Sequence, residues 1–177
     1  MDAISESRLK GVFPSLADKI RQMEHMLKFE NPPIYIRVVQ GYRTVEEQDA
    51  LYAIGRTTAG KVVTNCRGGH SYHNFGLAVD VVPSQFAPEQ PYSPDWNSSH
   101  PAWKKMQEAG QAVGLTSGAT WRTFPDAPHF QLTGDFPGNA PDDYVRDLAQ
   151  GPRGLQAVWD EVRRSIYPTT PTDALTV

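Results

Sequence analysis

A carboxylate interrupts the most apolar run of this sequence. Residues 77–82 are β-branched or otherwise apolar apart from Asp80, a composition that predicts a buried strand, and Pro83 is expected to end it. A buried carboxylate without a partner is costly, so the fold has to bring a cation or a hydrogen-bond donor to Asp80. The alternative is a turn in which Asp80 caps backbone N–H groups.

Helix and strand signals on both sides of this run predict an α+β fold, in which helices pack on a small, mostly antiparallel sheet. Four apolar residues recur on one helical face between positions 16 and 27. Thr44 and Glu47 have the spacing of a capping box, which predicts a helix start. The predicted helices cover 15–27, 44–54, 103–113 and 155–166, and the predicted strands cover 34–39, 77–82 and 129–132.

Two long segments without such signals flank the strand at 77–82. Residues 57–69 are rich in Gly, Thr and Asn, and residues 84–101 are rich in Pro, Ser and Asn. Long loops of this kind are uncommon in compact domains and often carry function. Functional residues are therefore expected beside the strand that the loops flank.

The length, net charge and cysteine content of the chain restrict the class of protein to which it can belong. Its 177 residues suit one domain at 1–167, with a core at roughly 8–133, a closing helix at 155–166 and a flexible tail at 168–177. A formal charge of −3 offers no basic field for nucleic acid, and no apolar run is long enough to span a membrane. The single cysteine, Cys66, excludes an internal disulfide. We expect a monomer.

Candidate metal ligands fall in two short polar clusters, at 68–80 and 121–130. His73 and Asp80 lie seven residues apart, and Gly76 allows the chain to turn between them so that both face one ion. His129 would supply a third ligand from another strand, with Asp126 beside it on a stiff turn. Catalytic zinc takes three such ligands and leaves a position for water, whose proton a neighbouring carboxylate can accept. The alternative is that His129 is a core histidine bonded to the backbone.

The residues around these ligands form a wider pattern. The two clusters resemble the signature Ser-x-His-x-x-Gly-x-Ala-x-Asp with a distal Asp-x-x-His. It marks the VanY-type D-Ala-D-Ala carboxypeptidases and the related L-alanyl-D-glutamate endopeptidases of phage and Bacillus. The resemblance implies a zinc peptidase with a hedgehog/DD-peptidase-like fold. The matching positions are Ser71, His73, Gly76, Ala78, Asp80, Asp126 and His129.

The resemblance covers roughly residues 8–133 and is strongest to the endopeptidase branch. One stretch departs from it. That branch commonly has a Trp-Gly-Gly-Asp-Trp-like sequence after Gly-Leu, where this chain has Thr-Ser-Gly-Ala-Thr-Trp at 116–121. The departure concerns the substrate preference and not the metal chemistry. The further matching segments are Gly41-Tyr42-Arg43-Thr44, Gln48, Leu51-Tyr52, Gly55-Arg56-Thr57, Thr64-Asn65 and Pro128-His129-Phe130-Gln131.

The resemblance also implies roles for the residues of the site. His73, Asp80 and His129 would bind zinc, and Asp126 would act as general base and acid. Arg43 matches an arginine that reaches into the site, where its planar fork suits a developing oxyanion or a substrate carboxylate. The alternative for Arg43 is a surface salt bridge.

Four more residues are placed beside the ligands or the substrate. Ser71 would orient a ligand or the substrate by a hydrogen bond, and Gln48 lies on the matching helix. Tyr72 and Trp121 are assigned to the same surroundings, with core or pocket wall as the alternative. By contrast, Cys66 and His70 are read as ordinary loop residues.

The sequence thus predicts a zinc-dependent peptidoglycan hydrolase that cuts the stem peptide, first of all at the L-Ala–D-Glu bond. The alternatives are a D-Ala-D-Ala carboxypeptidase and a non-catalytic, zinc-containing binding module. The first residues hold no basic stretch followed by an apolar run, which predicts synthesis in the cytoplasm without a signal peptide. Action on the wall would then follow release, and a phage endolysin set free by holin or lysis is the expected role.

Overall fold

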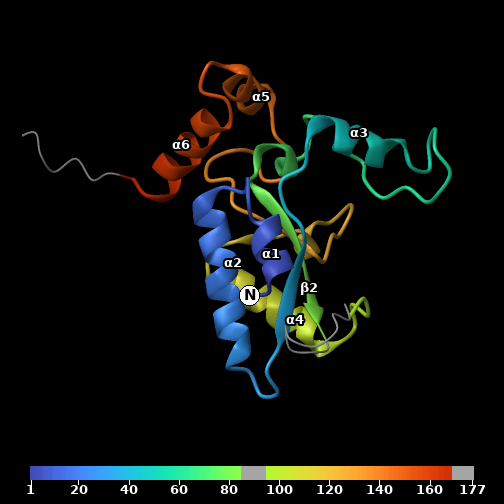
Figure 1. The fold of residues 1–177 in the computed structure, drawn as a ribbon, viewed down its shortest axis with the longest axis vertical. Coiled ribbons are helices and arrows are strands. Elements are labelled where there is room, and N and C mark those ends of the chain that lie inside the picture. Colours follow the sequence, from blue (N-terminus) through green and yellow to red (C-terminus); the bar gives the residue numbers. More distant parts are fainter. Residues whose placement is uncertain (85–94, 169–177) are drawn as a thin grey trace, which may run out of the picture.

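The computed structural model describes residues 1–84 and 95–168 of the chain (Figure 1). The predicted tail, from residue 169 on, and most of the predicted loop at 84–101 lie outside the described residues. The α-helices are α1 (Ala3–Arg8), α2 (Pro14–Lys28), α3 (Val45–Ala53), α4 (Pro101–Ala112), α5 (Asp143–Gln150) and α6 (Leu155–Ile166), and the 3-10 helices are η1 (Tyr72–Phe75) and η2 (Gly118–Thr120). The strands are β1 (Tyr35–Gln40), β2 (Ala78–Ser84), β3 (Thr116–Ser117) and β4 (His129–Gln131).

The four described strands form one sheet in the order β1-β2-β4-β3, and every neighbouring pair is antiparallel. The α+β fold with a small antiparallel sheet is therefore confirmed. Strand β2 lies between β1 and β4, and its register places Asp80 opposite His129 on β4. On the other side, the pairing with β1 shifts between Val38 and Gln40, where Asp80 faces Gln40. The predicted strand carboxylate thus lies within the sheet, next to a histidine.

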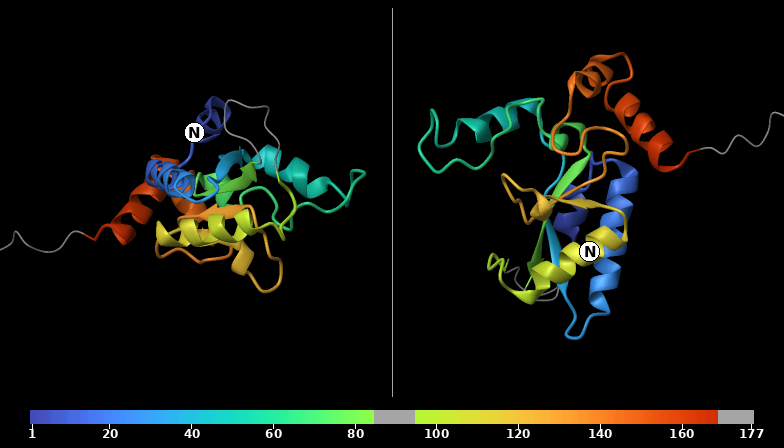
Figure 2. Two further views of the ribbon diagram at one scale, coloured as in Figure 1. Left: turned by 90° about the horizontal axis from the view of Figure 1, so that it is seen from below. Right: turned by 180° about the vertical axis from the view of Figure 1, so that it is seen from behind.

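Helices α2 and α4 pack against each other and against β1 and β2, which fixes the sheet from one face (Figure 2). The apolar face predicted for α2 is confirmed, because Leu16, Ile20 and Met23 are fully buried. Helices α5 and α6 pack together at one end of the molecule (Figure 1). Helix α3 instead projects from the body with the loop that follows it, and Gln48 is its buried residue. The predicted capping box of Thr44 and Glu47 begins this helix.

Strand β2 continues through Pro83 to Ser84, so the prediction that Pro83 ends the strand was wrong. Proline is excluded from central strands because it has no N–H group to donate. Strand β4, however, pairs with β2 only from Ala78 to Asp80. Pro83 therefore lies where β2 has only β1 beside it among the strands described, and it pairs there with Ile36.

The turn predicted between His73 and Asp80 is present. Helix η1 ends at Gly76, whose φ of 65° is in the left-handed region, and the chain then enters β2. A Cβ atom at this position would lie 2.5 Å from the Gly11 carbonyl oxygen, so both the backbone conformation and the space require glycine.

The helices of the described residues are too short or too polar to span a lipid bilayer.

Candidate metal centre and catalytic cleft

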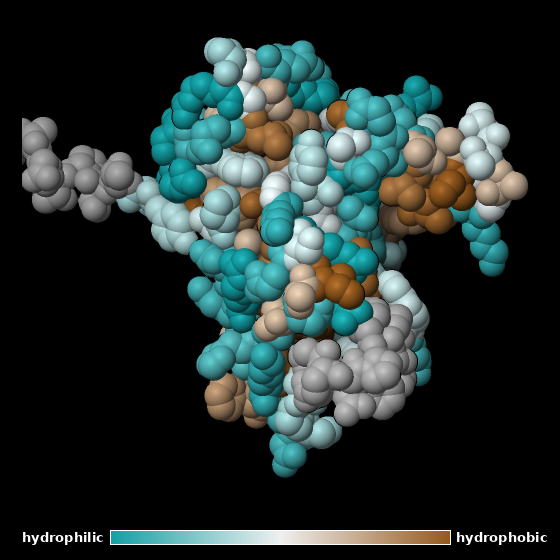
Figure 3. Space-filling model, viewed as in Figure 1, coloured by the Kyte–Doolittle hydropathy of each residue, from teal (hydrophilic) through white to brown (hydrophobic). Residues whose placement is uncertain are grey.

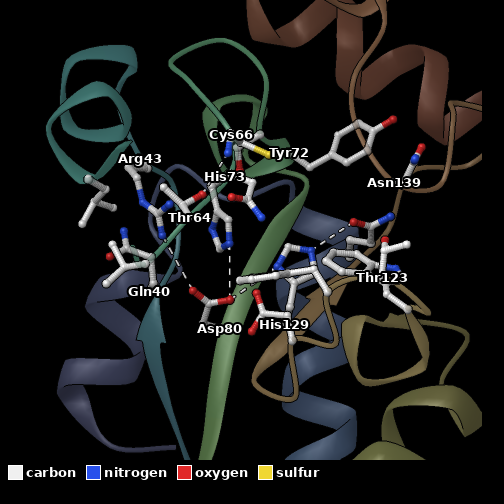
Figure 4. Close-up of a pocket in the computed structure, with 18 of the residues that line it drawn as sticks. Gln40, Arg43, Thr64, Cys66, Tyr72, His73, Asp80, Thr123, His129 and Asn139 are labelled. Atoms are coloured by element: carbon white, nitrogen blue, oxygen red, sulfur yellow. Dashed lines mark hydrogen bonds and ion pairs between the residues drawn. The ribbon is translucent and has the colours of Figure 1, made fainter. Parts of the chain in front are cut away.

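Three side chains from three elements converge at the middle of the sheet (Figure 4). His73 comes from η1, Asp80 from β2 and His129 from β4. The Asp80 Oδ1 atom lies 3.3 Å from His73 Nε2 and 3.4 Å from His129 Nδ1. One ligand atom of each residue lies within 4.8 Å of the other two, which is close enough for all three to bind one ion.

Hydrogen bonds on the far side of each ring fix the two imidazoles. His73 Nδ1 lies 2.9 Å from the Gly41 carbonyl oxygen, and His129 Nε2 lies 3.0 Å from Gln131 Oε1. Both partners are acceptors, since the amide nitrogen of Gln131 donates to the Gly138 carbonyl. These two ring nitrogens therefore carry the protons. In the neutral rings, His73 Nε2 and His129 Nδ1 turn their lone pairs toward Asp80.

This arrangement fits a divalent cation. Asp80 Oδ1 is buried and has no hydrogen-bond partner in the described part of the chain. Two nitrogen lone pairs and a carboxylate oxygen that face one another repel unless protons or a cation lie between them. Two imidazole nitrogens with one carboxylate oxygen are also a donor set of catalytic zinc sites.

The charges of Asp80 and the two histidines influence one another strongly. Burial alone would raise the pKa of Asp80, but His73 and His129 hold that pKa well below its usual range. Burial would likewise lower the pKa of His129, but the neighbouring carboxylate of Asp80 raises it. Metal binding must therefore displace protons, which makes the affinity of the site fall at acid pH.

Asp126 lies in the same cleft, on the tight turn that leads into β4. The His129 backbone N–H donates to the Asp126 carbonyl at 3.1 Å, and the Asp126 N–H donates to the Gly118 carbonyl at 3.0 Å. A Cβ atom at Gly118 would lie 2.7 Å from the Asp126 carbonyl oxygen and 2.9 Å from His129 Cβ, so glycine lets η2 approach this turn. Burial and the negative charge of Asp80 raise the pKa of the Asp126 carboxyl group.

Arg43 is a buried cation next to the three ligands, and the alternative of a surface salt bridge does not apply. Its Nη1 donates to Gln48 Oε1 at 2.6 Å, and its Nη2 lies 3.7 Å from Asp80 Oδ2. Gln48 in turn donates to the Cys66 carbonyl at 2.8 Å. Gln48, the buried residue of α3, thus fixes the Arg43 guanidinium and connects the projecting helix to the site.

The other predicted residues line a cleft of about 670 Å³ around the three ligands. The Trp121 ring lies 4.9 Å from the His129 ring, measured between centroids, and tilts over it. The Tyr72 ring forms part of the cleft wall. Its hydroxyl donates to the Pro137 carbonyl at 2.5 Å, which holds the 133–140 segment beside the cleft. Ser71 lines the cleft directly before η1.

Cys66 and His70, which were interpreted from the sequence as ordinary loop residues, lie in different surroundings. Cys66 also lines the cleft, and burial raises the pKa of its thiol, which disfavours the reactive thiolate. His70 is exposed on the loop, with its Nδ1 3.4 Å from an Arg146 guanidinium nitrogen.

Gln131 and Arg122 also line the cleft, but neither received a role from the sequence. Gln131 is fully buried and bridges His129 and Gly138 through its two amide atoms. Its position two residues after His129 in a strand was a usable signal, because alternate residues of a strand face the same side. No comparable sequence signal points to Arg122.

The known proteins that are similar to this chain are peptidases. Residues 64–132 match the sequence profile of a family described as D-alanyl-D-alanine carboxypeptidase. Over 106 residues the chain is 35% identical to the peptidoglycan L-alanyl-D-glutamate endopeptidase CwlK of Bacillus subtilis (strain 168), a match that covers 58% of this chain and 63% of CwlK. The chain thus spans less than two thirds of the length of this curated relative.

A solved structure has the same fold. The crystal structure of the Serratia marcescens L-Ala D-Glu endopeptidase ChiX matches with a TM-score of 0.51 and 28% sequence identity. The match covers 75% of this chain and 89% of ChiX, so it extends well beyond the segment that carries the ligands.

Proposed function

We propose that this chain is a metal-dependent peptidase of the family of the D-alanyl-D-alanine carboxypeptidases and L-alanyl-D-glutamate endopeptidases, and that it cleaves the stem peptide of peptidoglycan. One observation carries the proposal. His73, Asp80 and His129 meet in a cleft that also holds Asp126, a carboxyl group with a raised pKa. Ligands alone would suit a structural ion, whereas ligands beside a proton acceptor in an open cleft favour hydrolysis.

Zinc is the metal that we propose for the site. His73 would hold it through Nε2, Asp80 through Oδ1 and His129 through Nδ1. When bound, the ion supplies Lewis acidity to the scissile carbonyl group and to the attacking water. The bonds from His73 to Gly41 and from His129 to Gln131 keep each ring in the tautomer that offers a lone pair to the ion.

Asp126 and Arg43 perform the remaining steps of the reaction. Asp126 lines the cleft on the turn that leads into His129, so its carboxylate lies beside the ligands and is the proton acceptor of the site. It takes a proton from the attacking water and gives that proton to the amine that leaves. Arg43, fixed by Gln48, supplies a buried positive charge that stabilises the oxygen on which negative charge develops.

The L-Ala–D-Glu bond is the first choice of substrate, with the terminal D-Ala-D-Ala bond as the second. Both endopeptidases reported above, CwlK and ChiX, are named for the L-Ala–D-Glu bond, whereas the matching family profile is described as a D-alanyl-D-alanine carboxypeptidase. A pure binding module is the least favoured alternative, because such a module needs no base and Asp126 lines the cleft.

Digestion of purified peptidoglycan separates these three functions. Wall material is incubated with the zinc-loaded protein, and the soluble products are identified by mass spectrometry. New D-Glu N-termini support the endopeptidase, and released D-Ala supports the carboxypeptidase. If the wild type releases no more product than an Asp126→Asn variant with the same zinc content, the proposed hydrolysis is wrong.

A role as a phage endolysin is the proposed biological setting, and the resemblance of residues 8–133 to the phage endopeptidases supports it. An endolysin lyses its host only once it can reach the wall. Expression in the host together with a membrane-permeabilising holin should therefore cause lysis, and expression of either protein alone should not. Lysis that is equally slow with and without this protein would contradict the role.

A further inference from the structure

The walls of the catalytic cleft differ in charge. In Figure 4, Thr123 lies on one side of the three ligands, and Thr64 and Arg43 lie on the other. Besides Arg43, the side formed by α3 and its loop contributes neutral residues, among them Leu51, Val63 and Thr64. The opposite side is the segment 121–126, which carries both Arg122 and the catalytic carboxyl group of Asp126.

Arg122 is the cation of this cleft that has no partner among the described residues. Apart from the two histidine ligands, the basic residues that line the cleft are Arg43 and Arg122, and Arg43 is already bonded to Gln48 and close to Asp80. Arg122 is exposed, and no other residue in the described part of the chain forms a hydrogen bond, an ion pair or a ring contact with it. A guanidinium has five donors and binds carboxylates in a planar, two-point geometry. Its surroundings therefore leave it free to bind an anionic group of the substrate.

The role of Asp126 as proton donor indicates which half of the substrate lies near Arg122. Asp126 gives its proton to the leaving amine, so the leaving half of the substrate lies against the segment that holds Asp126. In an L-Ala–D-Glu bond that amine belongs to D-Glu. The peptide continues from D-Glu through the γ-carboxyl group, so the α-carboxylate stays free on the carbon atom that bears the leaving amine.

We propose that Arg122 is a specificity-determining residue that binds the α-carboxylate of the residue on the leaving side of the scissile bond. This inference rests on the proposed function and adds a charge preference to it. A stem peptide with a free α-carboxylate should be a better substrate than the same peptide with an α-carboxamide. The assignment also places one determinant of substrate preference two residues after the stretch 116–120, in which this chain departs from the endopeptidase pattern.

The test compares two synthetic peptides, L-Ala-γ-D-Glu-L-Lys and its α-carboxamide analogue, as substrates of the zinc-loaded protein. Hydrogen bonds to charged groups are strong, but exposed ion pairs are weakened by water and salt. We therefore expect the wild type to prefer the carboxylate by about fivefold to thirtyfold in kcat/KM, less at high salt. Arg122→Gln should reduce that preference to about twofold or less, and Arg122→Lys should keep part of it.

The control is Arg164→Gln, which removes an exposed arginine of α6 that pairs with Glu161 and does not line the cleft. It should retain the wild-type preference, and equal melting temperatures of all variants exclude loss of folding. If the wild type cleaves both peptides equally, or if Arg122→Gln keeps the full preference, the role of Arg122 is refuted while the proposed hydrolysis stands. If the wild type cleaves neither peptide nor purified wall, the proposed function fails and this inference fails with it.

Discussion

Replacing Gln131 by leucine should weaken metal binding at least tenfold while the protein still folds. Gln131 accepts from His129 Nε2 at 3.0 Å and donates to the Gly138 carbonyl, and its side chain is fully buried. Leucine has a similar volume but can neither accept nor donate. The substitution therefore removes two hydrogen bonds without opening a large cavity.

The two lost bonds differ in cost. His129 is buried, so its Nε2–H group is left without an acceptor, which costs about 1–3 kcal/mol of unfolding free energy. Gly138 is exposed, and water can replace the amide at its carbonyl, so little is added there. The His129 ring is also free to turn or to change tautomer. Loss of such a partner of a metal ligand typically lowers the affinity for the metal by about 10–100-fold.

Gln131→Glu is the matched control, because a carboxylate still accepts from His129 but cannot donate to Gly138. The zinc dissociation constant is measured by competition with a chelator, and the unfolding free energy of the metal-free protein by urea titration. Gln131→Leu should bind zinc at least tenfold more weakly than the wild type, whereas Gln131→Glu should stay within about threefold of it. Equal zinc affinities for Gln131→Leu and the wild type would refute the positioning of His129 by Gln131.

Three further substitutions test other parts of the account. Asp126→Asn should lower kcat by about 10²–10⁴-fold because the proton acceptor is lost, and unchanged turnover at full zinc content would contradict its role. Gly118→Ala should cost about 1–3 kcal/mol in urea unfolding, because its Cβ atom would lie 2.7 Å from the Asp126 carbonyl oxygen, whereas Gly138→Ala, with no atom within 4 Å, should cost far less. Burial raises the pKa of Asp2, but hydrogen bonds from Ser5 and Arg37 lower it by more, so the pKa lies below its usual range. The charge therefore stabilises the fold above the pKa of an unfolded aspartate, and this stability is lost as the pH falls through the folded-state pKa. The difference in unfolding free energy between the wild type and Asp2→Asn should shrink as the pH falls from 6 to 3. A difference in unfolding free energy that stays constant over this pH range would exclude this contribution of Asp2.

The parts of the fold with strong local signals were predictable. Helix α2 follows its apolar spacing, and α3 begins at the capping box of Thr44 and Glu47. Helices α1 and α5 were missed because they have only six and eight residues, too few for a periodic pattern. Helix α1 depends on its cap, Asp2, and on Ser5, whose buried hydroxyl accepts from the Val38 N–H. These are tertiary contacts that the sequence does not display.

The candidate site was predictable to the extent that its residues belong to a motif. His73, Asp80, Asp126 and His129 were found because their spacing matched a known signature, and the structure brings the three ligands together. Residues that act through space were not found. The role of Gln131 was missed although its spacing from His129 places both side chains on the same face of β4. Arg122 was missed because the side chains that surround a residue depend on the tertiary fold and leave no pattern in the sequence.

The position of the metal decides whether His73, Asp80 and His129 bind it. Crystals of the zinc-loaded protein are measured at the zinc absorption edge, and an anomalous difference map locates the ion. We expect one strong peak about 2.0–2.2 Å from His73 Nε2, Asp80 Oδ1 and His129 Nδ1. A peak bound by other residues, or none at these three atoms in crystals that contain one zinc per chain, would contradict this ligand assignment.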